Sequence, residues 1–563
     1  MEKLIECVPN FSEGLDLEKI HKITNEIESV KGIRLLNVDP GKATNRTVIT
    51  FIGNPEAVIE AAFLAIKKAG EILDMRFHEG AHPRMGATDV CPLIPIANIS
   101  MDETVNYAKL LAEKVGRDLE IPVYLYEEAQ QNKQRSNLSH IRAGEYEGFS
   151  EKIKLTEWKP DYGPSIFDLK RGATVIGARD FLIAYNINLN TQSVQRANSV
   201  AFDVRETGRI LRENDSPSGK EILDEAGKPI WKPGSLKSVK AIGWFIKEYG
   251  IAQISMNLTN IRVTPLHFAF DEVCKKAVER GLRVTGSEIV GLIPLQCLLE
   301  TAKYFLSKQN RSAGLSEDEL INFAIITLGL NQFQPFKPEE RIIEYLLDAP
   351  INNKLIGLSL KEFANEIASE SPAPGGGSVS AYLGVLAISL GTMVANLSAH
   401  KRSNEDRLSE FSHWAEIGQK LKKQILALVD EDTKAFLGFM EAFGMPKNSE
   451  IEKNIRKTQI QVATQKAIEI PFQVMKSALE SFDLLSQMAE SGNPNSISDI
   501  GVGALCARTA IQGAYLNVKI NGKNFKDKTW IDPVLVEAEK IEKLALEMEK
   551  QILDQVNFII NTL

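Results

Sequence analysis

Cysteine and histidine are scarce in this 563-residue chain, which has five of the first and seven of the second. The cysteines, Cys7, Cys91, Cys274, Cys297 and Cys506, lie far apart and form no CxxC pair. This pattern argues against a disulfide framework and against a cysteine-bound zinc site. It predicts reduced thiols and a cytoplasmic protein.

Several other signals are missing. The net charge is -8 and no block of lysine and arginine stands out, so nothing attracts nucleic acid or an anionic membrane globally. MEKLIECVPN has no signal-peptide pattern, and neither GxGxxG nor GK[ST] occurs. Residues 378–399 carry no charge, but they contain six serine, threonine or asparagine side chains and no aromatic or basic anchor at their start. We expect a buried core helix there rather than a membrane span.

The length requires more than one hydrophobic core. Hydrophobic periodicity predicts strands and helices in the order β-α-β-β-α-β over residues 4–96, and a similar series over 178–295. After residue 358 the periodicity is helical almost throughout. We therefore predict two ferredoxin-like βαββαβ units, an α+β half, followed by an all-α domain. The predicted boundaries are 1–165, 166–335, a linker at 336–357, and 358–563.

The segment FHEGAHPRMGATDV, residues 77–90, contains the pattern HExxH at His78 to His82. A zinc hydrolase needs both histidines on one helical face. Gly80, Ala81 and Pro83 disfavour a helix here, because Pro83 biases His82 away from the α region. The alternative is a loop histidine at the rim of a cleft, which can take up and return a proton near neutral pH. An ordinary solvated histidine fits the residues equally well.

Motifs along nearly the whole chain resemble one known family. They are ECVPNFSEG (6–14), TNRTV (44–48), HPRMGATDVCP (82–92), PVYLYEEA (122–129), IRAGEYE (141–147), GARDFLIAYNINL (177–189), NLTN (257–260), GLIPL (291–295), RIIEYLL (341–347), APGGGS (373–378) and GAYLNVKIN (513–521). In this order they closely resemble formimidoyltransferase-cyclodeaminase.

The resemblance implies a first reaction in which a formimino group moves from N-formimino-L-glutamate to tetrahydrofolate. It places the catalytic histidine at His82 and implies no metal. It also implies a folate-binding loop at GPSIFDLKRG, whose residues are Gly163, Pro164, Ser165, Ile166, Phe167, Asp168, Leu169, Lys170, Arg171 and Gly172. The glycines suit a rigid loop, and Lys170 and Arg171 suit carboxylates of a glutamyl tail. From the residues alone, this segment reads as an ordinary turn.

The resemblance implies a second reaction, which closes 5-formiminotetrahydrofolate to 5,10-methenyltetrahydrofolate and releases ammonia. Residues 424–443 predict a helix whose apolar stripe runs through Ile425, Val429, Phe436, Met440 and Phe443. Asp432 completes that stripe, whereas Asp430 and Glu431 are expected to face solvent. Burial would raise the pKa of the Asp432 carboxyl and suit it to proton transfer. The family's cyclodeaminase aspartate matches Asp432, although a buried ion pair would also explain it.

Gly375, Gly376 and Gly377 precede an expected helix start, whose free N–H groups could receive a carboxylate or amide of folate. Packing of a glycine turn against another subunit is equally plausible. Arg456 is a weaker candidate for binding the folate tail. The resemblance further implies a homo-oligomer, as dimers or a ring of dimers, and a polyglutamylated folate. A transferase with an inactive folate-binding helical domain, and a formyl rather than formimino donor, remain as alternatives.

Overall fold

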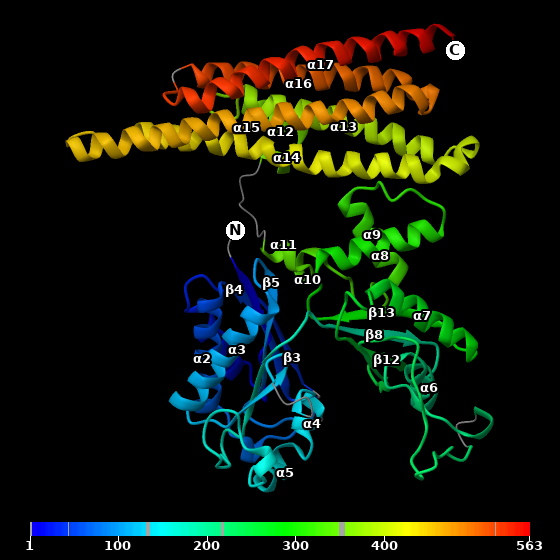
Figure 1. Cartoon of the computed structure of the whole chain (residues 1–563). Helices are drawn as coiled ribbons and strands as arrows, with labels where there is room; N and C mark the ends of the chain where they lie inside the picture. The colour runs from blue at the N-terminus through cyan, green and yellow to red at the C-terminus, as the bar shows by residue number, and fades with distance from the viewer. Residues whose placement is uncertain are drawn as a thin grey trace. The chain divides into compact units, whose positions relative to one another are not determined.

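The computed structural model describes residues 3–42, 44–80, 82–130, 135–215, 219–347, 355–523 and 525–562. The chain divides into two compact units, one formed by residues 1–298 with 325–349 and the other by residues 299–324 with 350–563 (Figure 1). The first unit is α+β and the second is helical, which confirms the predicted fold class.

The first sheet follows the predicted order. Its elements are β1 (Leu4–Cys7), β2 (Asn10–Phe11), α1 (Leu17–Glu28), β3 (Arg34–Gly41), β4 (Arg46–Gly53), α2 (Pro55–Ile72), β5 (Thr88–Ala97), α3 (Met101–Asp118), β6 (Val123–Glu127), α4 (Leu138–Arg142), α5 (Glu145–Lys152) and β7 (Thr174–Ala178). Strands β3, β4, β1 and β5 are antiparallel neighbours, as in a ferredoxin-like unit. The helices start at strong N-caps: Asp16 for α1, Asn54 for α2, and a Ser100–Glu103 capping box for α3.

Strands β6 and β7 extend this sheet in parallel beyond β5, in the order β5-β7-β6. Because β7 follows residue 165, the first sheet does not end at the boundary predicted there. The stretch 127–165, which precedes β7, contains α4 and α5.

The second sheet is four-stranded and antiparallel, in the order β11-β12-β8-β13. Its elements are β8 (Ile183–Leu189), α6 (Val194–Val204), β11 (Val239–Ile246), β12 (Ile251–Leu258), α7 (Leu266–Glu279) and β13 (Val284–Val290), with a two-stranded excursion of β9 (Arg209–Ile210) and β10 (Trp231–Lys232). The elements α8 (Leu295–Lys308), α9 (Glu317–Leu328), α10 (Pro338–Arg341) and α11 (Ile343–Leu347) follow. Residues 299–324 cluster with the helical unit, although they precede the domain boundary predicted at 335. Within the predicted linker, residues 348–354 lie outside the described residues.

The two faces of the first sheet differ in chemistry. Ile5 and Cys7 are fully buried in the core that α1, α2 and α3 form with the sheet. Glu6 and Val8 alternate with them and line a cavity on the other face. The alternation of β1 therefore separates a helix-covered core from a ligand-sized space.

The helical unit contains α12 (Leu360–Ile367), α13 (Gly376–Ala399), α14 (Leu408–Gly444), α15 (Glu450–Ser491), α16 (Ile497–Gly522) and α17 (Lys528–Thr562). α13 is long and apolar enough to cross a membrane, but 61% of its most apolar window is buried inside the protein. Gly384 and Gly391 allow it to approach Ile425 of α14 and Leu484 of α15 closely. α13 is thus the central helix of this core, as expected from its small residues.

Candidate active sites

The HExxH segment has no helical geometry. A short 3-10 turn ends at Phe77, and His78 is extended, with φ -82° and ψ 126°. His78 Nδ1 accepts from Arg84 Nε at 3.2 Å, and its Nε2 lies 2.8 Å from the Asn45 carbonyl oxygen. Among the described residues, no group of three His, Cys, Asp or Glu side chains could hold a metal. The helix that a zinc hydrolase of this type requires is absent here.

His82 is a partly buried loop side chain whose ring lies against Arg46 and the Pro83 carbonyl oxygen. Its Nδ1 lies 2.7 Å from the Pro83 carbonyl oxygen, to which it donates when it carries the proton. Arg46 Nη1 lies 2.5 Å from both ring nitrogens, Nδ1 and Nε2. Burial, followed by the charges of Arg46 and Arg142, lowers the pKa of His82 to about 4. The imidazole is therefore neutral at physiological pH.

Asp89 orders the two arginines beside His82. Its carboxylate is fully buried, makes an ion pair with Arg142, and lies 3.7 Å from Arg46 Nη2. It also accepts from the Met85 backbone N–H at 3.0 Å. Arg46 in turn donates to the Asn10 side-chain oxygen at 2.6 Å. These contacts fix the cationic surroundings that keep His82 unprotonated.

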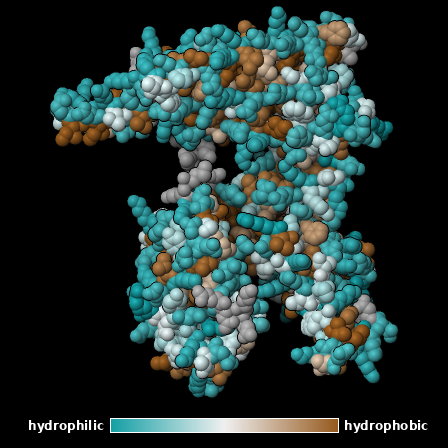
Figure 2. Space-filling view, in the orientation of Figure 1, coloured by the Kyte–Doolittle hydropathy of each residue, from teal (hydrophilic) through white to brown (hydrophobic). Residues whose placement is uncertain are grey.

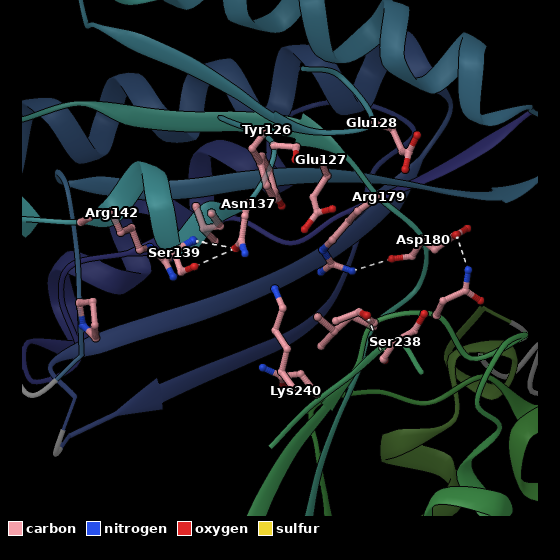
Figure 3. Close-up of a pocket in the computed structure, with 18 of the residues that line it drawn as sticks. Tyr126, Glu127, Glu128, Asn137, Ser139, Arg142, Arg179, Asp180, Ser238 and Lys240 are labelled. Carbon is pink, nitrogen blue, oxygen red and sulfur yellow. Dashed lines mark hydrogen bonds between the residues drawn. The ribbon is translucent and has the colours of Figure 1, made fainter. Parts of the chain in front are cut away.

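A cavity of about 740 Å³ opens at His82 between residues of the two sheets. Figure 3 shows its polar lining, in which Arg179 and Lys240 project into the space, Lys240 from the second sheet. A second cavity of about 430 Å³ shares His82, Arg142 and Arg179 with the first. Together they form one continuous site of the size that small ligands occupy.

Arg179 and Lys240 are the cations of this site that an anionic ligand could reach. Arg179 Nη1 donates to the Asp180 backbone oxygen at 2.9 Å. Among the described residues, no carboxylate oxygen lies within 4.0 Å of the head group of either side chain. The acids Glu127, Glu128 and Asp180 also line the site, so its charge is mixed rather than uniformly basic.

The expected folate loop, 163–172, does not contribute to the lining of either cavity. Its ends are fixed by glycines with positive φ: a Cβ on Gly163 would lie 2.3 Å from the Ile121 carbonyl oxygen, and one on Gly172 2.2 Å from that of Met85. Arg171 pairs with Asp168, and Lys170 Nζ donates to the Glu71 carbonyl oxygen at 2.7 Å. The two cations expected to meet a glutamyl tail are thus occupied, while Ile166 and Leu169 are exposed.

Asp432 of α14 lies at the N-terminus of α13. Ser378 donates to its Oδ2 through Oγ at 3.1 Å and also through its backbone N–H. A Cβ on Gly377 would lie 2.1 Å from Asp432 Oδ1, so only glycine permits this approach. Burial raises the pKa of the Asp432 carboxyl, and the bonds from Ser378 partly offset the rise. The protein's own carboxylate thus occupies part of the helix terminus where a folate carboxylate was expected.

The remaining predictions for α14 have mixed outcomes. Ile425 and Val429 are buried, but Phe436, Met440 and Phe443 are 37%, 46% and 58% exposed. The prediction that Asp430 faces solvent is wrong, because it is buried and accepts from the Leu355 N–H at 2.7 Å. Arg456 of α15 donates to the Phe443 carbonyl oxygen. Phe443 lies eleven residues along α14 from Asp432, which corresponds to roughly 16 Å of helix. Arg456 is therefore bound to a part of α14 distant from Asp432.

The sequence did not identify the site roles of five charged residues. Arg46, Arg142 and Asp89 surround His82, and Arg179 and Glu6 line the cavities beside it. Each lies within or beside an otherwise apolar strand or in a quoted motif. A charge between two buried apolar residues, as Glu6 is between Ile5 and Cys7, is the signal that could have found the cavity face.

Comparisons with known proteins match three successive segments of the chain. Family models match residues 4–179 (Formiminotransferase domain, N-terminal subdomain), 184–348 (Formiminotransferase domain) and 359–540 (Formiminotransferase-cyclodeaminase). The formimidoyltransferase-cyclodeaminase of Rattus norvegicus is 41% identical over 94% of this chain and 95% of that protein.

Two shorter relatives each match one half. The glutamate formimidoyltransferase of Thermoplasma acidophilum is 43% identical over 54% of this chain and 92% of its own length. The methenyltetrahydrofolate cyclohydrolase of Methylorubrum extorquens is 32% identical over 36% of this chain and 98% of its own length. The α+β half thus also exists as a separate protein among the relatives.

Proposed function

The chain belongs to the formimidoyltransferase-cyclodeaminase family, and we propose that it carries out two successive folate reactions of histidine degradation. The first transfers the formimino group of N-formimino-L-glutamate to N5 of tetrahydrofolate. The second closes that group onto N10 and expels ammonia. Tetrahydrofolate is a co-substrate in this scheme.

In the first reaction, N5 attacks the formimino carbon and a tetrahedral intermediate forms. Neutral His82 takes the N5 proton on Nε2 and returns it to the glutamate nitrogen as the carbon–nitrogen bond breaks. Arg46 must leave Nε2 when the substrate binds. With its pKa near 4, a protonated His82 is a strong acid, which favours donation to the departing amine. The neutral, oriented imidazole at the cavity is the single observation that carries this assignment.

In the second reaction, N10 attacks the formimino carbon, loses its proton, and ammonia departs after gaining one. Asp432 can carry out both transfers, because burial raises the pKa of its carboxyl group and so favours its holding a proton before handing it on. Ser378 donates to its ionised form. The unoccupied N–H groups at Gly375 and Gly376 are our candidates for contacts with the folate itself.

We infer that carboxylates bind at the free cations. Arg179 and Lys240 suit the formiminoglutamate carboxylates, since neither head group has a carboxylate partner among the described residues. Loop 163–172 would meet folate through its backbone and the exposed Ser165, Ile166 and Leu169, and a polyglutamyl tail would have to compete for Lys170 and Arg171.

We also propose a cytoplasmic homo-oligomer. Phe436, Leu437, Met440, Phe443, Ile451 and Ile455 are exposed where α14 and α15 meet, and Figure 2 shows a hydrophobic strip along that projecting end of the helical unit. An apolar strip of this kind is typical of a subunit contact. Sedimentation of the purified chain tests the proposal: a strict monomer would contradict it.

A pair of substitutions tests the two-site assignment. His82→Ala should remove formimino transfer and retain cyclisation of added 5-formiminotetrahydrofolate, whereas Asp432→Asn should do the reverse. Each loss should be about 10²- to 10⁴-fold, as for removal of a general acid–base group. Methenyl absorbance follows the second step. Loss of both activities in either folded variant would contradict the assignment.

The same assays decide between the remaining alternatives. A helical half that only binds folate would give no methenyl absorbance from 5-formiminotetrahydrofolate in the unsubstituted protein. A formyl donor would turn over formylglutamate faster than formiminoglutamate.

A further inference from the structure

Glu6 is a buried carboxyl group that bonds to none of the described residues. Its side chain is 2% exposed and lines the smaller of the two cavities next to His82. Among the described residues, no donor bonds to it and no cation lies within 4.0 Å; Arg179 acts on it only at longer range. Burial raises the pKa of Glu6 to about 7. Buried ionisable groups are almost always satisfied, so this one calls for a ligand that donates hydrogen bonds.

The cavity around Glu6 combines polar and apolar side chains. Strands β1, β3 and β4 contribute Glu6, Asn37 and Thr50 to its lining. The residues before and after the second sheet contribute Phe181, Leu182 and Leu292. A flat heteroaromatic ring suits such a lining, with its faces against apolar side chains and its polar edge toward polar ones.

The strand register sets the spacing between Glu6 and Asn10, the residue that holds Arg46 at His82. On β4, Ile52 pairs with Glu6 and Val48 pairs with Asn10, and Asn10 accepts from Arg46, the arginine that contacts His82. Four residues of strand correspond to roughly 13 Å. Glu6 and His82 also line the same cavity. This spacing suits contact between Glu6 and the far edge of a bicyclic ring whose near edge lies at His82.

The pterin of tetrahydrofolate has the matching chemistry at that far edge. Its 2-amino group and N3–H are adjacent donors, spaced for the two oxygens of one carboxylate. We propose that Glu6 binds these two donors and thereby directs N5 of the pterin toward His82. The inference rests on the proposed transferase function and adds to it the residue that orients the acceptor.

Glu6→Gln tests this assignment through a split between the two substrates. An amide cannot accept from both donors, so the KM for tetrahydrofolate should rise about 10- to 100-fold, the usual effect of losing a charge-assisted pair. The KM for formiminoglutamate should stay within about twofold of the unsubstituted value, because that substrate does not reach Glu6. Equal KM values for tetrahydrofolate in the two proteins, or equal rises for both substrates, would overturn the inference.

Glu13→Gln is the matched control. Glu13 is a second buried carboxyl group of the same segment, but it accepts from the Leu15 and Asp16 N–H groups and lines neither cavity. Its substitution should lower thermal stability and leave the KM for tetrahydrofolate unchanged. At pH 8, Glu6→Gln should instead unfold at a higher temperature than the unsubstituted chain, because the substitution removes a buried, unpaired carboxylate. At pH 5 Glu6 is protonated, so the difference in unfolding temperature should be smaller. A purely structural Glu6 would behave like Glu13.

A ligand analogue gives a test whose first arm uses the unsubstituted protein alone. Tetrahydrofolate lacking the 2-amino group should bind the unsubstituted protein about tenfold or more weakly by titration calorimetry, and should lose no further affinity in Glu6→Gln. Equal affinity of the two folates for the unsubstituted protein would overturn the role of Glu6. Absence of transferase turnover in the unsubstituted protein would instead overturn the proposed function.

Discussion

Gly377→Ala probes how closely α13 holds the Asp432 carboxylate. The new Cβ would lie 2.1 Å from Oδ1 and 2.5 Å from both Cγ and Oδ2 of Asp432. An ordinary contact needs at least about 3.4 Å, so the carboxylate must retreat by more than about 1 Å. A displacement of this size typically costs about 10²-fold in rate, or roughly 2.7 kcal/mol in the activation free energy. We expect cyclodeaminase turnover to fall by that factor.

Stability should change much less than turnover. Displacing Asp432 weakens its bonds with Ser378 and the helix terminus, at a cost of about 1 kcal/mol. Alanine in place of glycine inside the first turn returns up to about 1 kcal/mol of helix propensity. The two effects nearly cancel, so the urea midpoint should stay close to that of the unsubstituted chain. Lost activity therefore reports a displaced side chain rather than an unfolded unit.

Gly438→Ala is the control for this substitution. Gly438 lies in α14, the helix that carries Asp432, and a Cβ there would meet nothing within 4 Å. Its alanine variant should keep full cyclodeaminase activity and gain about 0.5–1 kcal/mol. Methenyl absorbance from 5-formiminotetrahydrofolate measures the second activity, and formimino transfer serves as an internal standard. If folded Gly377→Ala retained more than a third of the cyclodeaminase rate, the described approach of Asp432 to α13 would be refuted.

Two further predictions concern the first site. Asp89→Asn leaves Arg46 and Arg142 without their buried counter-charge, so the free energy of unfolding should fall by about 3–5 kcal/mol in urea melts; a loss below about 1 kcal/mol would contradict the ion-pair description. The pKa of His82 is lowered to about 4 by burial and the two guanidiniums, so folded His82 stays neutral as pH falls from 8 to 5.5. Its contribution to stability is present above the unfolded pKa near 6.5 and is lost as pH falls through about 4. The transferase kcat/KM, which reports the free enzyme, should accordingly show no acidic decline near pH 6.5, and Arg46→Gln should move the decline upward; a midpoint at 6.5 in the unsubstituted enzyme would exclude this environment.

The secondary structure of the α+β half could be predicted because its strands and helices differ in period. Alternation at β1 and the three-four spacing of α1 and α2 are local properties, and their caps confirm the helix starts. Strands β6 and β7 were not predicted as part of the first sheet. Their pairing with β5 is parallel and joins residues separated by several helices, so no local pattern encodes it.

The outcome at α14 shows what periodicity leaves open. The stripe through Ile425, Val429 and Phe436 identifies one face of the helix, and the first two residues are buried. Whether that face is covered along its whole length depends on where the neighbouring helices end, which is a tertiary property. Asp430 lies off the stripe and is nevertheless buried, because residue Leu355, distant in sequence, donates to it. A helical wheel cannot anticipate a partner from another segment.

The glycine run before α13 is the most instructive case for function. A free helix terminus attracts a carboxylate, and from the sequence that carboxylate could belong to a ligand or to the protein. The close approach of Gly377 to Asp432 decides in favour of the protein for part of the terminus. This arrangement sets two opposing effects on one group: burial raises the pKa of Asp432, whereas Ser378 lowers it. Both effects therefore act on the residue that, in the proposed reaction, must accept a proton from N10 and donate one to ammonia.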